Sequence, residues 1–101
     1  MVVNFEVMPL GVGTSASPYL AEILKMVDDS RLDYRLTAMG TVVEGEWDEV
    51  MGVIKKCHAA LEKDCRRIST SIKIDYRKGK KRRMEAKIES IEQKVGKALK
   101  K

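Results

Sequence analysis

Histidine, cysteine and aromatic residues, which supply much of the chemistry of active sites, are scarce in this chain. Its 101 residues include one His, two Cys, one Trp, three Tyr and one Phe. No Ser-His-Asp order, metal quartet or paired-acid motif can be assembled from them. His58 recurs at helical spacing beside core positions, where a structural role is favoured over that of a base. We therefore expect a protein with no enzymatic activity, cofactor or metal.

The two cysteines do not favour a disulfide. Cys57 and Cys65 fall on one expected helix, eight residues apart. A rise of about 1.5 Å per residue separates them by about 12 Å, beyond the reach of a disulfide. No Cys-x-x-Cys motif is present, so a metal site is not indicated either. We expect both to be reduced and at least half-buried.

Long apolar runs are also missing. No stretch approaches the ~20 apolar residues that span a bilayer. The first six residues enter a strand directly, without a basic segment followed by an apolar run, so no signal peptide is expected. These features favour a cytoplasmic location and no membrane partner.

Hydrophobic periodicity predicts four strands and three helices. Alternation at period 2 indicates strands, and apolar residues at i, i+3, i+4 and i+7 indicate helices. In chain order these are strand 2–8, helix 18–27, strands 34–39 and 41–44, helix 47–64, strand 67–76 and helix 84–100. Two right-handed βαβ crossovers then give a ferredoxin-like α+β sandwich with strand order 4-1-3-2 and an extra C-terminal helix. We expect one domain over residues 1–101, with residues 77–101 forming a basic linker and the last helix.

Both crossover helices cover the same face of such a sheet, which leaves the other face open. Alternation places carboxylates, hydroxyls, an amide and a lysine there beside methionines and a valine: Asn4, Glu6, Met8, Arg35, Thr37, Met39, Val42, Glu44, Ser69, Ser71, Lys73 and Asp75. Two interpretations remain open. The face is either solvated, with cross-strand charge pairs such as Glu6 with Lys73, or forms a polar pocket for a small, partly cationic ligand.

The Gly-rich loop 11–15 opens the first helix, and Ser17-Pro18 is typical of an N-cap followed by proline at the first helical position. Exposed N–H groups at a helix N-terminus suit an anion. The glycine spacing matches neither common phosphate-binding pattern, however, so an ordinary loop is favoured.

Basic residues concentrate at the C-terminal end of the chain. Of the net charge of +5, residues 77–101 contribute +8, from eleven Lys or Arg and three Glu. Six of the seven residues 77–83 are basic, which is compatible with nucleic-acid binding. No base-stacking aromatics occupy the open sheet face, so a solvated linker is favoured and nucleic acid is not the expected partner.

The last helix has a narrow apolar seam at 4-3-4-3 spacing, made by Met84, Ile88, Ile91, Val95 and Ala98. Such a seam is typical of a helix that contacts another helix. We expect it to serve assembly, with packing against its own domain as the alternative.

Several stretches resemble one family in the same order. They are Phe5-Glu6-Val7-Met8-Pro9-Leu10-Gly11, Thr14-Ser15-Ala16-Ser17, Met39-Gly40-Thr41, Glu44-Gly45-Glu46-Trp47-Asp48-Glu49-Val50 and Ile72-Lys73-Ile74-Asp75-Tyr76-Arg77. Together they resemble the small thiamine-binding proteins, a family long of unknown function related to the YkoF-type domain that binds thiamine or its hydroxymethylpyrimidine. The resemblance covers nearly the whole chain. Tyr76, where a more polar residue is expected, and the strongly basic 77–83 segment depart from it.

The resemblance implies a ferredoxin-like protomer that assembles as a dimer of dimers and holds a thiamine-like ligand non-covalently near a subunit interface. The candidate ligand-binding residues it indicates are Thr14, Ser15, Ser17, Met39, Gly40, Thr41 and Glu44. Glu44 is the expected polar anchor, since a carboxylate can bridge the donors of an aminopyrimidine. A purely structural or regulatory oligomer, and nucleic-acid binding through residues 77–83, are the alternative functions.

Overall fold

The computed structural model describes residues 1–11, 16–79 and 82–101. Along these ranges the elements are β1 (Val2–Leu10), α1 (Ser17–Asp29), β2 (Asp33–Thr37), β3 (Gly40–Glu44), α2 (Trp47–Glu62), β4 (Arg67–Asp75) and α3 (Arg83–Val95). This is the predicted β-α-β-β-α-β-α order of an α+β protein.

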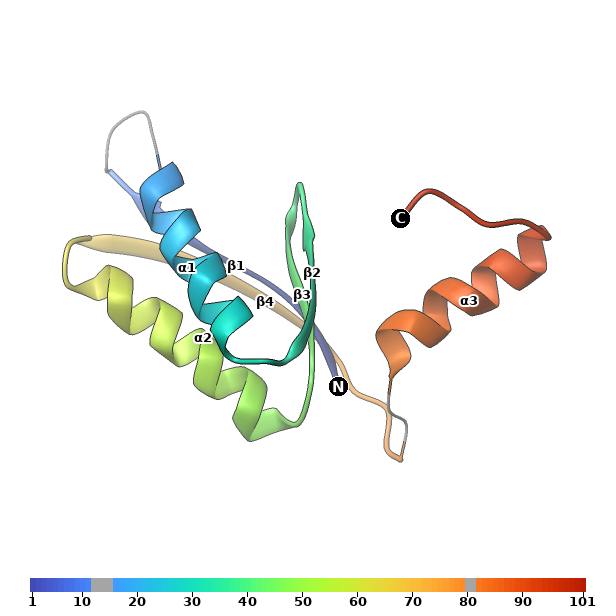
Figure 1. Cartoon of the computed structure of the whole chain (residues 1–101). Helices are drawn as coiled ribbons and strands as arrows, with labels where there is room; N and C mark the ends of the chain where they lie inside the picture. Colours follow the sequence, from blue (N-terminus) through green and yellow to red (C-terminus); the bar gives the residue numbers. More distant parts are fainter. Residues whose placement is uncertain (12–15, 80–81) are drawn as a thin grey trace.

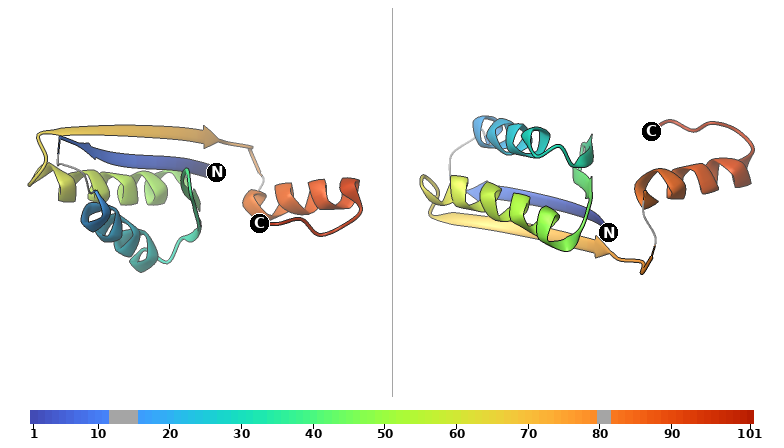
Figure 2. Two further views of the ribbon diagram at one scale, coloured as in Figure 1. Left: turned by 90° about the horizontal axis from the view of Figure 1, so that it is seen from above. Right: turned by 60° about the horizontal axis from the view of Figure 1, so that its bottom comes forward.

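The strands form one antiparallel sheet in the order β2-β3-β1-β4, which confirms the predicted arrangement. Helices α1 and α2 lie side by side on one face of this sheet, and its other face is left open (Figures 1 and 2). Helix α3 lies beyond the end of β4, apart from the two crossover helices (Figure 1).

The core lies between the sheet and the two crossover helices. The odd-numbered side chains Val3, Phe5 and Val7 of β1 are buried, as alternation predicts. They pack against an apolar stripe on α1 and α2 made by Ile23, Val27, Val50, Ile54, Cys57 and Leu61. Burial of each such large apolar side chain stabilises the fold by about 1.5–3 kcal/mol.

Both cysteines are buried free thiols, which confirms the prediction that they are reduced and at least half-buried. Because burial disfavours the thiolate, it raises the pKa of Cys57 to about 11.

Some predicted boundaries were wrong. β1 runs through Pro9 to Leu10, whereas the sequence suggested a break at Pro9. The second strand ends at Thr37, because Ala38 and Met39 form the two-residue turn of the β2–β3 hairpin. Met39 therefore lies at the tip of the hairpin and not on the open sheet face. α3 ends at Val95, where Gly96 adopts a left-handed conformation with φ +87°.

The N-cap of α1 also differs from the prediction. The capping residue is Ala16 and not Ser17, and no side chain among the described residues makes a capping hydrogen bond there. Ser17 is the first residue of the helix and is exposed. Proline still occupies the first turn, where backbone N–H groups have no intrahelical acceptor, so the N–H that proline lacks is not needed there.

The predicted ion pair between Glu6 and Lys73 is wrong. The two strands do pair, and both residues lie on the open face. Lys73, however, lies directly opposite Asn4, and Glu6 lies opposite Ser71. No ion pair joins Lys73 to Glu6 in the described part of the chain.

Candidate functional site

The β2–β3 hairpin is much shorter than β1, and this difference creates a step in the sheet. β1 pairs with β4 along all nine of its residues, from Val2 to Leu10. It pairs with β3 only from Val2 to Phe5, because β3 begins at Gly40 just after the hairpin turn. Beyond Phe5, no strand in the described part of the chain pairs with the β3 side of β1.

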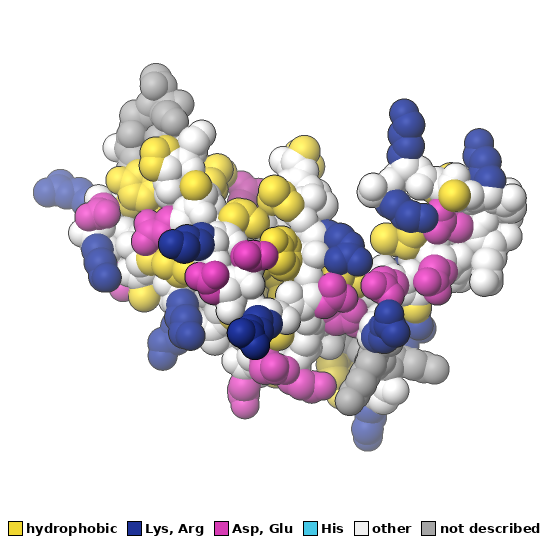
Figure 3. Space-filling model, viewed as in Figure 1, with side chains coloured by type: hydrophobic (Ala, Val, Ile, Leu, Met, Phe, Trp, Pro, Cys, Tyr) yellow, Lys and Arg dark blue, Asp and Glu magenta, His cyan; other side chains and the backbone are white. Residues whose placement is uncertain are grey.

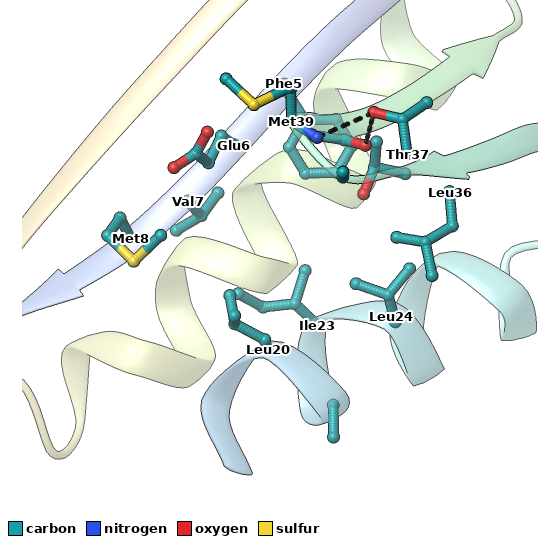
Figure 4. A pocket seen from close by; sticks show the side chains of 14 residues that line it. Phe5, Glu6, Val7, Met8, Leu20, Ile23, Leu24, Leu36, Thr37 and Met39 are labelled. Atoms are coloured by element: carbon teal, nitrogen blue, oxygen red, sulfur yellow. Dashed lines mark hydrogen bonds between the residues drawn. The ribbon is translucent and has the colours of Figure 1, made fainter. Parts of the chain in front are cut away.

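A groove of about 430 Å³ occupies this step. Its walls are β1 over residues 5–8, the α1 side chains Leu20, Ile23 and Leu24, and the hairpin over residues 36–41 (Figure 4). Apolar side chains gather on the surface between α1 and the hairpin (Figure 3). The volume falls within the range of small-molecule sites, which are mostly apolar with a few placed polar groups.

The hairpin wall of the groove is held by its own hydrogen bonds. The Thr37 hydroxyl donates to the Gly40 carbonyl at 2.8 Å and accepts from the Met39 backbone N–H at 3.2 Å (Figure 4). Gly40 has φ +152°, and a Cβ at this position would lie 2.7 Å from Asn4 Oδ1 and 3.2 Å from the Phe5 carbonyl. Glycine thus permits the close approach of the hairpin to β1 that shapes the end of the groove.

A second, smaller hollow of about 160 Å³ lies on the open face. Its polar side chains are Asn4, Glu6, Ser71 and Lys73. Phe5, Glu6 and Met39 line both hollows, so the apolar groove and the polar hollow share a rim.

Three of the predicted ligand-binding residues lie together in the groove: Met39, Gly40 and Thr41. Thr41 is buried and lies opposite Phe5 on the helix-covered face. Met39 is 81% exposed at the hairpin tip, so its side chain is not part of the packed core. Ser17 lines neither hollow, and Thr14 and Ser15 lie outside the described residues.

Glu44, the predicted ligand anchor, makes its hydrogen bonds to α3 in this structure. Its carboxylate accepts hydrogen bonds from the backbone N–H groups of Arg83 at 2.5 Å and Met84 at 3.4 Å. It therefore caps the N-terminus of α3, where a carboxylate also interacts favourably with the helix dipole. Glu44 lines neither hollow.

Further contacts fix the first turns of α3 to the sheet. Met84 is buried, Lys87 forms an ion pair with Asp75, and Arg35 lies 3.5 Å from Glu85. The apolar seam predicted for this helix is thus divided. Its first residue packs within the chain, whereas Ile91 and Val95 are 54% and 53% exposed.

The sequence did not single out most of the apolar groove residues. Phe5, Val7, Leu20, Ile23 and Leu24 were read only as core positions of β1 and α1. One signal was available: the third strand was expected to have four residues against seven for the first. An antiparallel sheet built from such unequal strands must leave part of the longer strand without a partner.

The comparisons with known proteins agree with this architecture. UPF0045 protein sll0230 of Synechocystis is 36% identical over 93 residues, which cover 91% of this chain and 77% of the relative. UPF0045 protein MJ1052 of Methanocaldococcus jannaschii is 35% identical over 91 residues, which cover 90% of this chain and 91% of the relative. The crystal structure of MJ1052 superposes with a TM-score of 0.82 over 89% of this chain and 93% of that one, at 36% identity.

A candidate thiamine biosynthesis or salvage protein from Thermotoga maritima has the same fold, with a TM-score of 0.78 at 23% identity over 89% of this chain and 96% of that one. Within the described residues, no helix is long and apolar enough to cross a membrane. The sequence profile described as "Thiamine-binding protein" matches residues 3–92. With most of its length matched in this way, the chain belongs to the thiamine-binding protein family.

Proposed function

We propose that this protein binds thiamine, or a ligand containing its hydroxymethylpyrimidine, non-covalently and without catalysing a reaction, in the groove between β1, α1 and the β2–β3 hairpin. The observation that carries the proposal is a groove of about 430 Å³ that contains the Met39-Gly40-Thr41 turn in a chain of the thiamine-binding protein family.

The chemistry of the groove suits such a ligand. Phe5 and the leucines of α1 offer apolar surface to a flat heterocycle. Met39 adds a polarisable thioether at the rim, and Glu6 adds a carboxylate there. Methionine and carboxylate surroundings favour a soft organic cation such as a thiazolium.

Isothermal titration calorimetry with thiamine, its phosphates and hydroxymethylpyrimidine tests this proposal. Ala21 is an exposed residue of α1 that lines the groove, so Ala21→Trp fills the groove without disturbing the core. Ala59 is exposed on α2 and lines neither hollow, so Ala59→Trp is a matched control. We expect Ala21→Trp to weaken binding at least tenfold and Ala59→Trp to leave it unchanged. No binding by the unmodified protein, or equal binding by both variants, contradicts the proposal.

We further propose that the protein is a homo-oligomer, with a second copy covering the outer half of α3. The support is the pair Ile91 and Val95, which are large apolar side chains left in water beyond the turns that Glu44 and Asp75 hold. Burying each would stabilise an assembly by roughly 1.5–3 kcal/mol before the cost of association is subtracted. A dimer of dimers is the arrangement that the resemblance implies.

Light scattering on a double variant tests this second proposal. We expect Ile88→Lys with Ile91→Lys to lower the oligomer order while the domain stays folded. Ser90→Lys with Gln93→Lys adds the same charge to α3 at exposed positions outside the seam and should leave assembly unchanged. An unchanged mass for the seam variant would show that copies do not meet through α3.

A further inference from the structure

Strand β4 forms one long edge of the sheet. It is the last strand in the order β2-β3-β1-β4, and it pairs with β1 without interruption from Arg67 to Asp75. Its other side has no partner strand among the described residues, and β4 lies at the rim of the sheet in both views of Figure 2. The opposite edge, β2, has five residues. A long, regular edge strand offers a row of free backbone N–H and C=O groups to another chain.

The pairing of β1 shows which residues of β4 carry these free groups. The N–H and C=O of one residue in an antiparallel strand point to the same side, and successive residues alternate between sides. The Met1 ammonium donates to the Gly45 carbonyl at 2.9 Å and the Gly45 N–H donates to the Met1 carbonyl at 3.1 Å, so odd-numbered residues of β1 point toward β3. Even-numbered residues of β1 therefore exchange hydrogen bonds with odd-numbered residues of β4. The free backbone groups of β4 are those of its even-numbered residues: Ile68, Thr70, Ile72 and Ile74.

Apolar side chains are exposed along the same edge. Ile72 lies opposite Phe5 and Ile74 lies opposite Val3, so both isoleucines belong to the helix-covered face. Phe5 and Val3 are 2% and 0% exposed, whereas Ile72 and Ile74 are 39% and 37% exposed. Sheet edges are usually protected by proline, by bulges or by charged side chains that point inward. β4 contains no proline, its pairing with β1 has no bulge, and its residues on the helix-covered face are uncharged.

We propose that the β4 edge pairs with the β4 edge of a second copy of this chain, antiparallel and centred on Ser71, so that two four-stranded sheets join into one. A two-fold axis brings the same surface of both copies together, so the edge must complement itself. With Ser71 at the centre, all nine residues of one strand overlap all nine of the other. The inference rests on the proposed homo-oligomer and deepens it, because a dimer of dimers needs two different two-fold contacts and α3 supplies one.

The charges of β4 favour this centre over its neighbours. With Ser71 at the centre, Arg67 lies opposite the partner's Asp75, which is a pair of opposite charges. Moving the centre by one residue toward the start of the strand would set Lys73 opposite the partner's Arg67. Moving it by one residue toward the end would set Arg67 opposite the partner's Arg77. Like charges directly opposite each other are destabilising, so of these three centres the one at Ser71 is favoured.

The exposed isoleucines also gain partners in this arrangement. Ile74 lies opposite the partner's Ile68, and Ile72 lies opposite the partner's Thr70, on the helix-covered face of both sheets. These are the residues with free backbone groups, so each such pair can exchange both of its hydrogen bonds. The joined strands therefore pair the free N–H and C=O groups and remove apolar surface from water at the same time.

Cysteine cross-linking tests the register. Opposite residues that do not exchange hydrogen bonds have Cα atoms about 4.5 Å apart, within the range of a disulfide. Ser71 faces its own copy in such a pair, whereas Ser69 faces the partner's Lys73 and lies about 13 Å from the partner's Ser69. Ser69 and Ser71 are both exposed, and the natural cysteines are buried. We expect Ser71→Cys to form a covalent dimer under mild oxidation at least tenfold faster than Ser69→Cys, and equal rates overturn the inference.

A proline variant tests the hydrogen bonding. Thr70→Pro removes an N–H that points away from β1, so the hydrogen bonds between β1 and β4 are kept. Thr70→Ala is the matched control, because it shortens the same exposed side chain and keeps the N–H. By light scattering, we expect Thr70→Pro to halve the mass of the assembly and Thr70→Ala to leave it unchanged. A folded Thr70→Pro variant of unchanged mass overturns the inference, and if this variant does not fold, the cross-linking rates decide.

The outcomes separate this inference from the proposals made above. If the unmodified protein is oligomeric but Ser71→Cys cross-links no faster than Ser69→Cys, the inference fails and the homo-oligomer formed through α3 stands. A monomeric unmodified protein overturns both, and would leave the β4 edge to a strand of a different protein. Neither measurement depends on a ligand, so a failure of thiamine binding leaves the inference intact.

Discussion

Replacing Glu44 with alanine should release the first turn of α3 from the sheet without unfolding the domain. The carboxylate accepts from the Arg83 and Met84 N–H groups, which have no intrahelical partners because they open the helix. The side chain belongs to β3, so it is a cap supplied from a distant part of the chain. Alanine removes both acceptors and the negative charge at the positive end of the helix dipole.

The expected magnitude follows from these two hydrogen bonds. Loss of a capping side chain costs about 0.5–2 kcal/mol, and the charge adds about 0.3–1 kcal/mol to a cap of this kind. The 3.4 Å bond to Met84 is long, so it contributes less than the bond to Arg83. We expect the free energy of opening of α3 to fall by about 1–2 kcal/mol, which is a factor of about 5–30 in amide protection.

Native-state hydrogen exchange measures this effect residue by residue. Amides of the first turns of α3 should lose protection, and amides of β1 and β4 should keep theirs. Glu62→Ala is the matched control, because Glu62 is an exposed carboxylate on α2 that lies 3.4 Å from His58 and makes no hydrogen bond or ion pair with α3 among the described residues. The reasoning is refuted if Glu62→Ala and Glu44→Ala change the protection of α3 equally.

Two further predictions concern glycine and cysteine. Gly40→Ala should lower the free energy of unfolding in urea by about 1–3 kcal/mol, because the new Cβ would lie 2.7 Å from Asn4 Oδ1 and the φ of residue 40 is +152°. Gly52→Ala is the control: it lies in α2, its Cβ would have nothing within 4 Å, and it should raise the free energy of unfolding by about 0.5–1 kcal/mol. Equal effects of the two substitutions would contradict this contrast. Burial raises the pKa of Cys57 from 9.0 to about 11, so its contribution to stability is complete below pH 9 and is lost as pH rises from about 9 to 11, where the unfolded chain ionises first. Between pH 9 and 11, the free energy of unfolding measured in urea should fall more steeply with pH for the unmodified protein than for Cys57→Ala. Parallel pH dependences of the two proteins would contradict this prediction.

The fold was predictable because its determinants are local. The alternation of Val3, Phe5 and Val7 and the apolar stripes of the helices specify which faces meet, and the crossover rule then allows one strand order. The error at Pro9 has a physical source. Proline is excluded from a strand only where its N–H would be needed, and Pro9 points to the side of β1 that β3 does not reach.

The candidate site was only partly predictable because it depends on register and on distant contacts. The Met39-Gly40-Thr41 turn could be named from sequence, but the groove beside it exists because the pairing of β1 with β3 ends at Phe5 and Thr41. Glu44 shows the same limit. Alternation along the strand predicted that the Glu44 side chain lies on the open face. Its hydrogen-bond donors, the backbone N–H groups of Arg83 and Met84, lie 39 and 40 residues away in the chain, so no local sequence pattern could predict them.

The unequal division of charge along the chain bears on the homo-oligomer proposed above. Residues 77–101 carry +8, and α3 lies beyond the end of β4, outside a body whose residues 1–76 carry −3. Each molecule is therefore a long-range electrostatic dipole with a cationic end. Such a dipole favours head-to-tail encounter, and the attraction extends over a Debye length of about 10 Å at 0.1 M salt. Ionic strength should accordingly control the rate at which copies associate more than the affinity they reach, since the exposed contacts of α3 are apolar.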